Sequence, residues 1–415
     1  MNVDSKVSQS CRSCGCKKLF TLVNLGMSPF SNSYIKPINL NKSECFYPLH
    51  AVVCEECFLV QIDEFLKPDR IFSDYVYFSS YSNTWLDHCK SYVDMVIDRF
   101  NLTTNSRVVE IASNDGYLLQ YFIKKKIPCL GVEPAENVAD IAIKKGIPTE
   151  KAFFGAAFAK ELAKKNGTTN LILANNVLAH VPDINDFVLG LKLLLSEDGV
   201  ITIEFPHLLK LVQENQFDTI YHEHFSYLSL YFVEKIFFNY GLKIFDIDEI
   251  STHGGSLRIY VTHIDSTLHP ISSSVTKIRD SEDKALFNKV SGYLGFEKKV
   301  NKVKRDLLTF LNTVKQDGKS VVGYGAAAKG NTLLNYCGIR SDYLDYVVDL
   351  SPHKQGLYMP GSHLPIYGPE KIAITKPDFV LILPWNISSE IISQNTYIQS
   401  WGGKFVVAIP ELKIL

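Results

Sequence analysis

The feature that most constrains the fold is a strand–turn–helix–strand pattern in the first third of the chain. An apolar run beginning at Val108 ends in Glu110, a turn of small residues follows, and a helical pattern starts near Gly116. About twenty residues later a second apolar run ends in Glu133. Such a turn can bring backbone N–H groups to a ligand, and the acid can accept hydrogen bonds from ribose hydroxyls. The pattern predicts an α/β fold with a ribose-bearing ligand at this edge.

The composition of the turn narrows the kind of ligand. It lacks the G-x-G-x-x-G fingerprint and has Ala112, Asn114 and Gly116 where a dinucleotide fold carries glycines. The series Glu-x-Ala-x-Asn-x-Gly resembles the first motif of S-adenosylmethionine-dependent methyltransferases, whose ligand has an amino-acid tail and no pyrophosphate. We therefore expect a methyl-donor site, and the alternative is an α/β turn that binds no nucleotide. The expected lining residues are Glu110, Ala112, Asn114, Asp115, Gly116, Glu133, Pro134 and Asn175.

Length and charge set broad limits on the protein. A chain of 415 residues exceeds a usual single domain, so two or three domains are expected. The formal net charge of −1 gives no electrostatic footprint for nucleic acid. The amino terminus has no apolar stretch of signal-peptide length, and no segment approaches the roughly 20 apolar residues of a membrane span. The sequence therefore predicts a cytoplasmic protein that binds neither nucleic acid nor membrane.

Two C-x-x-C pairs near the amino terminus predict a metal site. Cys11 and Cys14 form one pair, and Cys54 and Cys57 form the other. Two such pairs can offer four thiolates to one tetrahedral ion, which suits zinc, although Cys16 is an alternative ligand. Because four protein ligands leave no open coordination position, this zinc is expected to hold the fold and to take no part in chemistry.

Alternating strand and helix patterns predict the arrangement of the remaining chain. Five strand-like runs between residues 107 and 206 are separated by helical patterns, as in a doubly wound parallel sheet. The runs 241–250 and 256–264 are expected to add an antiparallel edge pair, and a charged helical stretch, 286–314, is expected to lead into a last domain. The predicted domains are a zinc-binding module, a methyltransferase domain and a C-terminal Rossmann-like domain: 1–68, 69–300 and 301–415.

The last domain opens with a second glycine turn. Gly323 and Gly325 precede a helix, but the third glycine of a dinucleotide fingerprint is replaced by Ala328, so the indication of a nicotinamide is weak. Lys329 in this turn is better suited to a diphosphate. We therefore expect Lys329 and its neighbour Tyr324 to contact the substrate.

The segment richest in chemical groups is Tyr221–Phe225, which reads Tyr-His-Glu-His-Phe. A histidine can remove a proton at neutral pH, a nearby carboxylate can orient it, and a phenol can donate to a developing oxyanion. The two histidines are spaced differently from those of the H-E-x-x-H zinc motif. The alternative is a loop whose histidines only cap helices and bond to the backbone. The proximity of a methyl-donor motif favours catalysis.

Taken in order, these motifs resemble the sugar C-methyltransferase family. The cysteine pairs, E-x-A-S-N-D-G, Y-H-E-H-F and a terminal G-Y-G-A-A-A-K-G span essentially the whole chain. Members of this family methylate C3 of nucleotide-linked 4-keto-6-deoxyhexoses in deoxysugar biosynthesis. The resemblance implies zinc in the first domain, S-adenosylmethionine in the second, and nucleotide-sugar binding at the cleft with the third.

The resemblance also implies roles for single residues. His224 is expected to be the base, with Tyr221 and Glu223 as partners. Tyr75 and His180 lie in family-like contexts and are expected to join the catalytic group. His222 is a candidate substrate contact, and we expect it to point away from His224.

Three other functions remain open at this point. The first is an O- or N-methyltransferase acting on a sugar or another small molecule. The second is a nucleic-acid methyltransferase with a zinc reader, against which the near-neutral charge argues. The third is a zinc-stapled binding protein without turnover.

Overall fold

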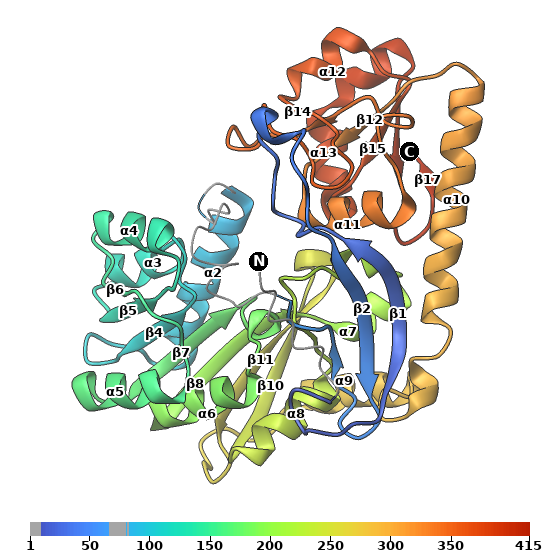
Figure 1. Ribbon diagram of the computed structural model, residues 1–415. Coiled ribbons are helices and arrows are strands. Elements are labelled where there is room, and N and C mark those ends of the chain that lie inside the picture. The colour runs from blue at the N-terminus through green and yellow to red at the C-terminus, as the bar shows by residue number, and fades with distance from the viewer. Residues whose placement is uncertain (1–9, 66–79, 81–82) are drawn as a thin grey trace.

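The computed structural model describes residues 10–65, 80 and 83–415, which are built around three β-sheets (Figure 1). The sheets have four, seven and six strands. The N-terminal sheet lies between the other two parts, and a long helix, α10 (Phe296–Gln316), runs along one side of the molecule toward the C-terminal sheet (Figure 1). Within these residues no helix is both long and apolar enough to cross a bilayer.

The N-terminal sheet combines a long hairpin with two short strands. Its strands, in sheet order and all antiparallel, are β1 (Leu19–Ser28), β2 (Tyr47–Cys54), β3 (Val60–Gln61) and β9 (Ser226–Tyr227). The fourth strand follows the Tyr-His-Glu-His-Phe segment directly, although it is more than 160 residues away from its partner β3 in the sequence. The N-terminal sheet therefore holds the end of that segment.

The central sheet has the order β10-β11-β8-β7-β4-β5-β6. The five strands of this sheet that come first in the chain, β4 to β8, are parallel. Strand β11 lies antiparallel between β8 and β10, which confirms the predicted doubly wound sheet with its edge pair. The strands are β4 (Val108–Ile111), β5 (Cys129–Val132), β6 (Thr149–Glu150), β7 (Thr169–Asn175), β8 (Leu195–Pro206), β10 (Leu242–Ile250) and β11 (Ser256–His263).

Alternating side chains of the central strands pack against helices on opposite faces of the sheet. In β7, Leu171 and Leu173 join the core with α2 and α3, whereas Ile172 and Ala174 join the core with α5, α6 and α8. The helices of this part are α2 (Asn83–Arg99), α3 (Leu119–Lys124), α4 (Glu136–Lys144), α5 (Ala156–Asn166), α6 (Ile184–Leu194), α7 (Leu208–Gln213), α8 (Leu230–Asn239) and α9 (Ser273–Lys284).

The C-terminal sheet is a second open α/β sheet, as predicted. Its strands, in the order β14-β13-β12-β15-β16-β17, are parallel except for the last. They are β12 (Val321–Tyr324), β13 (Val347–Val348), β14 (Ile366–Tyr367), β15 (Phe379–Ile382), β16 (Lys404–Val407) and β17 (Lys413–Ile414). The helices besides α10 are α11 (Ala328–Cys337), α12 (Glu370–Thr375) and α13 (Ser388–Gln394).

The helical stretch expected over 286–314 is shorter than predicted. The helix α10 begins only at Phe296, because Gly295 before it has the left-handed conformation with φ 83°. A left-handed residue cannot continue a right-handed helix, and glycine adopts that conformation without steric cost. The preceding helix α9 was not predicted.

Each parallel sheet reverses its strand order at one place, and the two places adjoin. In the central sheet the reversal lies between β4 and β7, and in the C-terminal sheet it lies between β12 and β15. Open α/β sheets bind ligands at the carboxyl ends of strands at such switch points. The turns η5 (Thr252–Gly254) and η7 (Trp385–Ile387), which flank these points, are in contact. The fold therefore brings two potential ligand sites together.

We expect Leu307→Ala to destabilise the protein strongly. Leu307 is fully buried on the apolar face of α10, which packs against β1 and α11. Removing a buried leucine costs about 2–5 kcal/mol through lost burial and the cavity left behind. The matched control is Thr309→Ala, an exposed site on the same helix. Differential scanning calorimetry should show a transition lowered by several degrees in Leu307→Ala only, and equal shifts in both variants would contradict this role of α10.

Candidate active site and metal centre

The four predicted cysteines form one compact group. The Sγ atoms of Cys11 and Cys57 are 3.4 Å apart, those of Cys14 and Cys54 are 3.5 Å apart, and all four lie within 4.8 Å of one another. A tetrahedral zinc with Zn–S bonds of about 2.3 Å places its sulfurs about 3.8 Å apart, so the donor set fits zinc. The thiol of Cys16 lies outside this group and accepts a hydrogen bond from the backbone N–H of Lys18.

The turn after β4 is held in an unusual conformation. Ala112 and Asn114 have positive φ values of 54° and 50°, which are uncommon for residues other than glycine. Gly116 has a φ of 76°, and a Cβ atom there would lie 2.1 Å from the Ile147 side chain. Strain of this kind persists where the surrounding structure holds it, often at ligand sites.

The Glu133 carboxylate fixes this turn from the next strand. It accepts hydrogen bonds from the backbone N–H of Asn114 at 2.9 Å and of Ala135 at 2.8 Å. Burial raises the pKa of Glu133, and these two backbone donors oppose that shift. A carboxylate has about four acceptor positions, so the same group can also receive ribose hydroxyls.

The other expected donor-site residues lie along the same sheet edge. Glu110 is buried in β4, and burial raises its pKa well above the usual range. Asp115 pairs with Lys145 at 3.1 Å, and Pro134 directly follows Glu133. Asn175 ends β7, and its amide oxygen is buried without a hydrogen-bond partner among the described residues. The structure thus gathers this set at the first switch point.

The Tyr-His-Glu-His-Phe segment brings two imidazoles together. The His224 and His180 rings are 4.6 Å apart, and the Tyr221 ring lies 4.0 Å from His224. Nδ1 of His224 is 2.9 Å from the Thr219 carbonyl oxygen, and Nδ1 of His180 is 2.7 Å from that of Glu223. Because a carbonyl oxygen only accepts hydrogen bonds, each ring carries its proton on Nδ1. The Nε2 atom of each ring is therefore the one that can take a further proton.

Burial keeps both imidazoles neutral. It lowers the pKa of His180 to about 4, and it lowers the pKa of His224 well below its usual range. The same environment raises the pKa of the Glu223 carboxyl to about 7. Glu223 accepts a hydrogen bond of 2.6 Å from the Asn32 amide of the N-terminal sheet region. Ionisable groups with strongly shifted pKa values concentrate at functional sites.

His222 lies on the other side of the segment. Its Nε2 atom is 3.1 Å from the Pro48 carbonyl oxygen, and the rings of Phe30, Tyr47 and Phe65 surround it at 5.0–6.1 Å. The structure does not bring His222 to the His180–His224 pair. Tyr75, also expected at the site, lies outside the described residues.

Lys329 lies at the second switch point, in the first turn of α11. Its Nζ atom donates to the Asn386 amide oxygen at 2.7 Å and lies 4.8 Å from the centre of the Trp385 ring. Burial lowers the pKa of Lys329, and nearby Asp218 opposes the shift. Tyr324, the other expected contact in this domain, packs into the core, where its hydroxyl accepts from Asn395 at 3.4 Å.

Sequence reasoning missed two residues of this region. Asp218 is fully buried, accepts a 2.8 Å hydrogen bond from the Trp385 indole, and has its pKa raised to about 7 by burial. His253 lies in η5 with a φ of 56°. Asp218 stands just before the Tyr-His-Glu-His-Phe segment and His253 before two glycines, so both positions carried a local signal.

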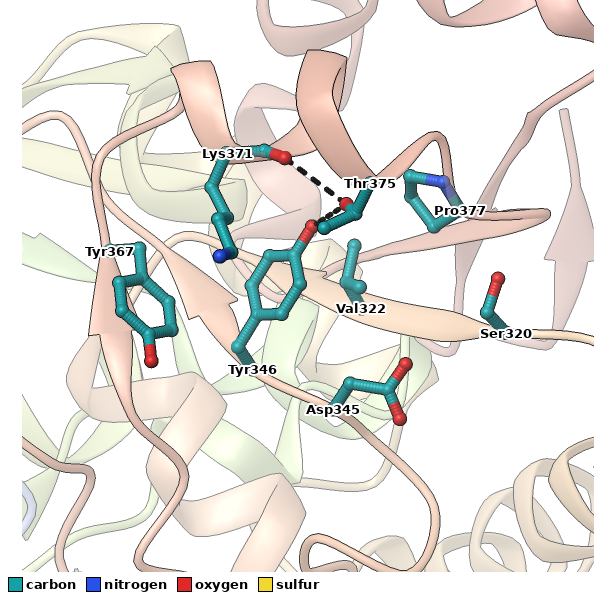
Figure 2. Close-up of a pocket in the computed structure, with 8 residues that line it drawn as sticks. All are labelled: Ser320, Val322, Asp345, Tyr346, Tyr367, Lys371, Thr375 and Pro377. Carbon is teal, nitrogen blue, oxygen red and sulfur yellow. Dashed lines mark hydrogen bonds between the residues drawn. The ribbon is translucent and has the colours of Figure 1, made fainter.

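A separate cavity of about 270 Å³ lies in the C-terminal domain, away from these residues (Figure 2). Figure 2 shows Tyr346 and Thr375 joined by a hydrogen bond beside Lys371. Ser320, Asp345 and Pro377 in its wall precede their strands, so the cavity is at the amino edge of the sheet, opposite the switch point. It is not part of the candidate active site.

The sheet order, the donor-site turn and the paired imidazoles define a methyltransferase of the α/β class, and comparisons with known proteins agree. Residues 11–72 match a zinc binding domain, residues 87–247 a methyltransferase domain, and residues 251–410 the C-methyltransferase C-terminal domain. C-methyltransferase NovU of Streptomyces niveus is 34% identical over 405 residues, which cover 98% of this chain and 96% of that protein. The chain therefore belongs to the C-methyltransferase family, as its motifs predicted.

Solved structures that match part of this chain include two methyltransferases. One, from Anabaena variabilis, is 15% identical, with a TM-score of 0.35 over 41% of this chain and 83% of that chain. Magnesium protoporphyrin IX methyltransferase from Synechocystis, with bound S-adenosylmethionine, is 16% identical, with a TM-score of 0.33 over 47% of this chain and 88% of that chain. Likenesses of this size carry no functional argument. The family itself makes the protein an S-adenosylmethionine-dependent C-methyltransferase with a zinc-binding domain.

We expect one zinc ion per chain in freshly purified protein. Cys54→Ser should lose most of it, because its thiolate is one of the four donors. Cys16→Ser is the matched control and should keep its zinc. Metal analysis of both variants by mass spectrometry tests this. Full zinc content in Cys54→Ser, or its loss from Cys16→Ser, would contradict the ligand set.

We expect Glu133→Gln to weaken binding of S-adenosylmethionine. A hydrogen bond to a charged group contributes about 1.5–3 kcal/mol, so the loss of the carboxylate should raise Kd about 10- to 100-fold. Glu161→Gln, an exposed change on α5, should leave Kd unchanged. Isothermal titration calorimetry measures both. Equal affinity of Glu133→Gln and wild type would rule out the ribose contact.

Proposed function

We propose that this enzyme methylates C3 of a nucleotide-linked 4-keto-6-deoxyhexose, with His224 as the base. The supporting observation is the His180–His224 pair, whose Nδ1 atoms donate to backbone carbonyls and whose Nε2 atoms can accept protons. This pair lies near the carboxyl edge that carries the donor motif, on a segment packed against α11 through the 3.2 Å hydrogen bond between Thr332 and Ile220.

The chemistry requires a base that is neutral before the reaction. A C–H bond beside a ketone is acidic because its anion delocalises onto the carbonyl oxygen. The low pKa of His224 leaves the imidazole unprotonated, so Nε2 can take the C3 proton. When bound, S-adenosylmethionine supplies an electrophilic methyl group. The enzyme must hold C3 close to and in line with that group, which is the contribution of the two adjoining sheets.

The acidic and phenolic neighbours support the base in this proposal. Glu223 holds His180 through its backbone carbonyl, and its own side chain is anchored by Asn32. The Tyr221 ring covers one face of His224, at 4.0 Å between ring centres. These contacts limit the orientations that the imidazole can adopt, and Tyr221 brings a phenol able to donate to an oxyanion.

The C-terminal sheet provides the nucleotide end of the site in this proposal. Lys329 lies where an open α/β sheet binds ligands, and its ammonium suits a diphosphate. Asn386 and Trp385 hold the amine in place through a hydrogen bond and a cation–π contact. No nicotinamide is needed for the reaction.

The substrate class is tested by incubating the enzyme and S-adenosylmethionine with a panel of nucleotide-linked 4-keto sugars, followed by mass spectrometry. A product heavier by one methyl group, with the new carbon at C3 by NMR, is expected. Wild-type enzyme should also exchange the C3 proton for solvent deuterium without the methyl donor. Methylation at oxygen or nitrogen, without exchange at C3, would overturn the proposal.

We expect His224→Ala to lose at least about a hundredfold in kcat, because general-base catalysis contributes roughly 10²–10⁴ in rate. Binding of both ligands should be retained. His222→Ala, which removes the neighbouring imidazole on the opposite side, should cost less than His224→Ala. Steady-state kinetics and the deuterium exchange measure both variants. If His222→Ala abolishes exchange and His224→Ala preserves it, the two roles must be reversed.

A further inference from the structure

His253 occupies a strained position that several parts of the chain hold in place. Its backbone has φ 56° and ψ 16°, a left-handed conformation that is costly for a histidine. On one side, Thr252 donates to the buried Glu204 carboxylate at 2.8 Å, and on the other, Gln216 donates to the Gly254 carbonyl at 2.7 Å. A Cβ atom on Gly254 would lie 2.5 Å from the Trp385 ring. The loop therefore has little freedom to relax.

The imidazole of His253 has a defined donor atom. Its Nε2 atom is 3.3 Å from Nδ2 of Asn176, the residue directly after Asn175 of the donor edge. An amide nitrogen can only donate, so Nε2 accepts and the ring proton sits on Nδ1. Desolvation by the surrounding protein atoms lowers the pKa of His253 to about 4, the charge of Lys329 contributes to the same shift, and the ring stays neutral. The residue nevertheless remains exposed, so protein atoms crowd the ring without closing off its access to solvent.

His253 is surrounded by residues to which the proposed reaction assigns a role. A positive charge on His253 would lower the pKa of His180 and of His224, and the positive charge of Lys329 lowers the pKa of His253. The Trp85 ring lies 6.1 Å away, edge to face. His253 thus stands among the base, the donor edge and the second switch point. Strained left-handed residues cluster at active sites and ligand-binding segments.

We propose that His253 is a catalytic residue whose Nδ1–H donates a hydrogen bond to the C4 oxygen of the substrate as the C3 proton leaves. The C3–H electron pair becomes the C3–C4 π bond, the carbonyl π pair moves to oxygen, and the proton goes to Nε2 of His224. The His253 proton is shared with the oxyanion and is not transferred. A preorganised neutral donor stabilises such a charge without reorganisation. This inference rests on the proposed function.

The decisive variant is His253→Gly, because glycine adopts the left-handed conformation freely and removes only the imidazole. With the sugar that wild type methylates, kcat should fall about 10²–10³-fold, the usual effect of losing one oxyanion donor. Deuterium exchange at C3 should slow to a similar degree, whereas KM should change only a few-fold. Added imidazole should restore part of the activity.

The matched control is His363→Gly, which replaces another left-handed histidine, one whose partner is Glu44. It should leave kcat and exchange unchanged. A second variant, Asn176→Gly, keeps the left-handed backbone at this position but removes the amide that holds the ring proton on Nδ1, and it should slow exchange less than His253→Gly does.

Each outcome separates the two proposals. If wild type methylates C3 and His253→Gly keeps its kcat and exchange rate, the role of His253 is refuted and the proposed function stands. If His253→Gly raises only KM, His253 binds substrate without stabilising the oxyanion, which also refutes the inference. If wild type shows neither methylation nor exchange at C3, both proposals fail together.

Discussion

The candidate active site depends on backbone pairing between β3 and β9, two strands from distant parts of the chain. Val60 pairs with Tyr227 and Gln61 with Ser226, and the Ile62 N–H donates to the Phe225 carbonyl at 3.2 Å. The strand β3 begins three residues after Cys57, one of the four clustered thiols. A zinc ion held by these thiols would anchor the strand that pairs with the end of the Tyr-His-Glu-His-Phe segment.

The second constraint is the contact between the two open sheets. Buried Asp218 accepts a hydrogen bond from the indole of Trp385. This bond links the loop before the Tyr-His-Glu-His-Phe segment to the end of β15. Lys329 lies over the same indole. Burial raises the pKa of the Asp218 carboxyl and lowers the pKa of the Lys329 amine, and the charge of each group opposes the shift that burial imposes on the other.

Four non-glycine residues with a left-handed backbone lie along one edge of the central sheet. Ala112, Asn114, Asn176 and His253 all have positive φ, and they follow β4, follow β7 or precede β11. Each such residue costs of order 1–3 kcal/mol, which the rest of the fold must offset. Their grouping where donor and substrate are proposed to meet is consistent with strain retained for function.

The sequence by itself determined the elements and the kinds of site. Strand and helix periodicity predicted both parallel sheets, the C-x-x-C spacing predicted the group of four thiols, and local motifs predicted a donor turn and a catalytic role for the Tyr-His-Glu-His-Phe segment, because these signals depend on neighbours along the chain. Only the tertiary structure decided that β9 joins the N-terminal sheet, that His222 packs against Pro48 while His224 meets His180, and that His253 and Asp218 belong to the same region. These facts depend on packing between segments far apart in sequence, and no local pattern encodes which of two histidines, two residues apart, will meet His180.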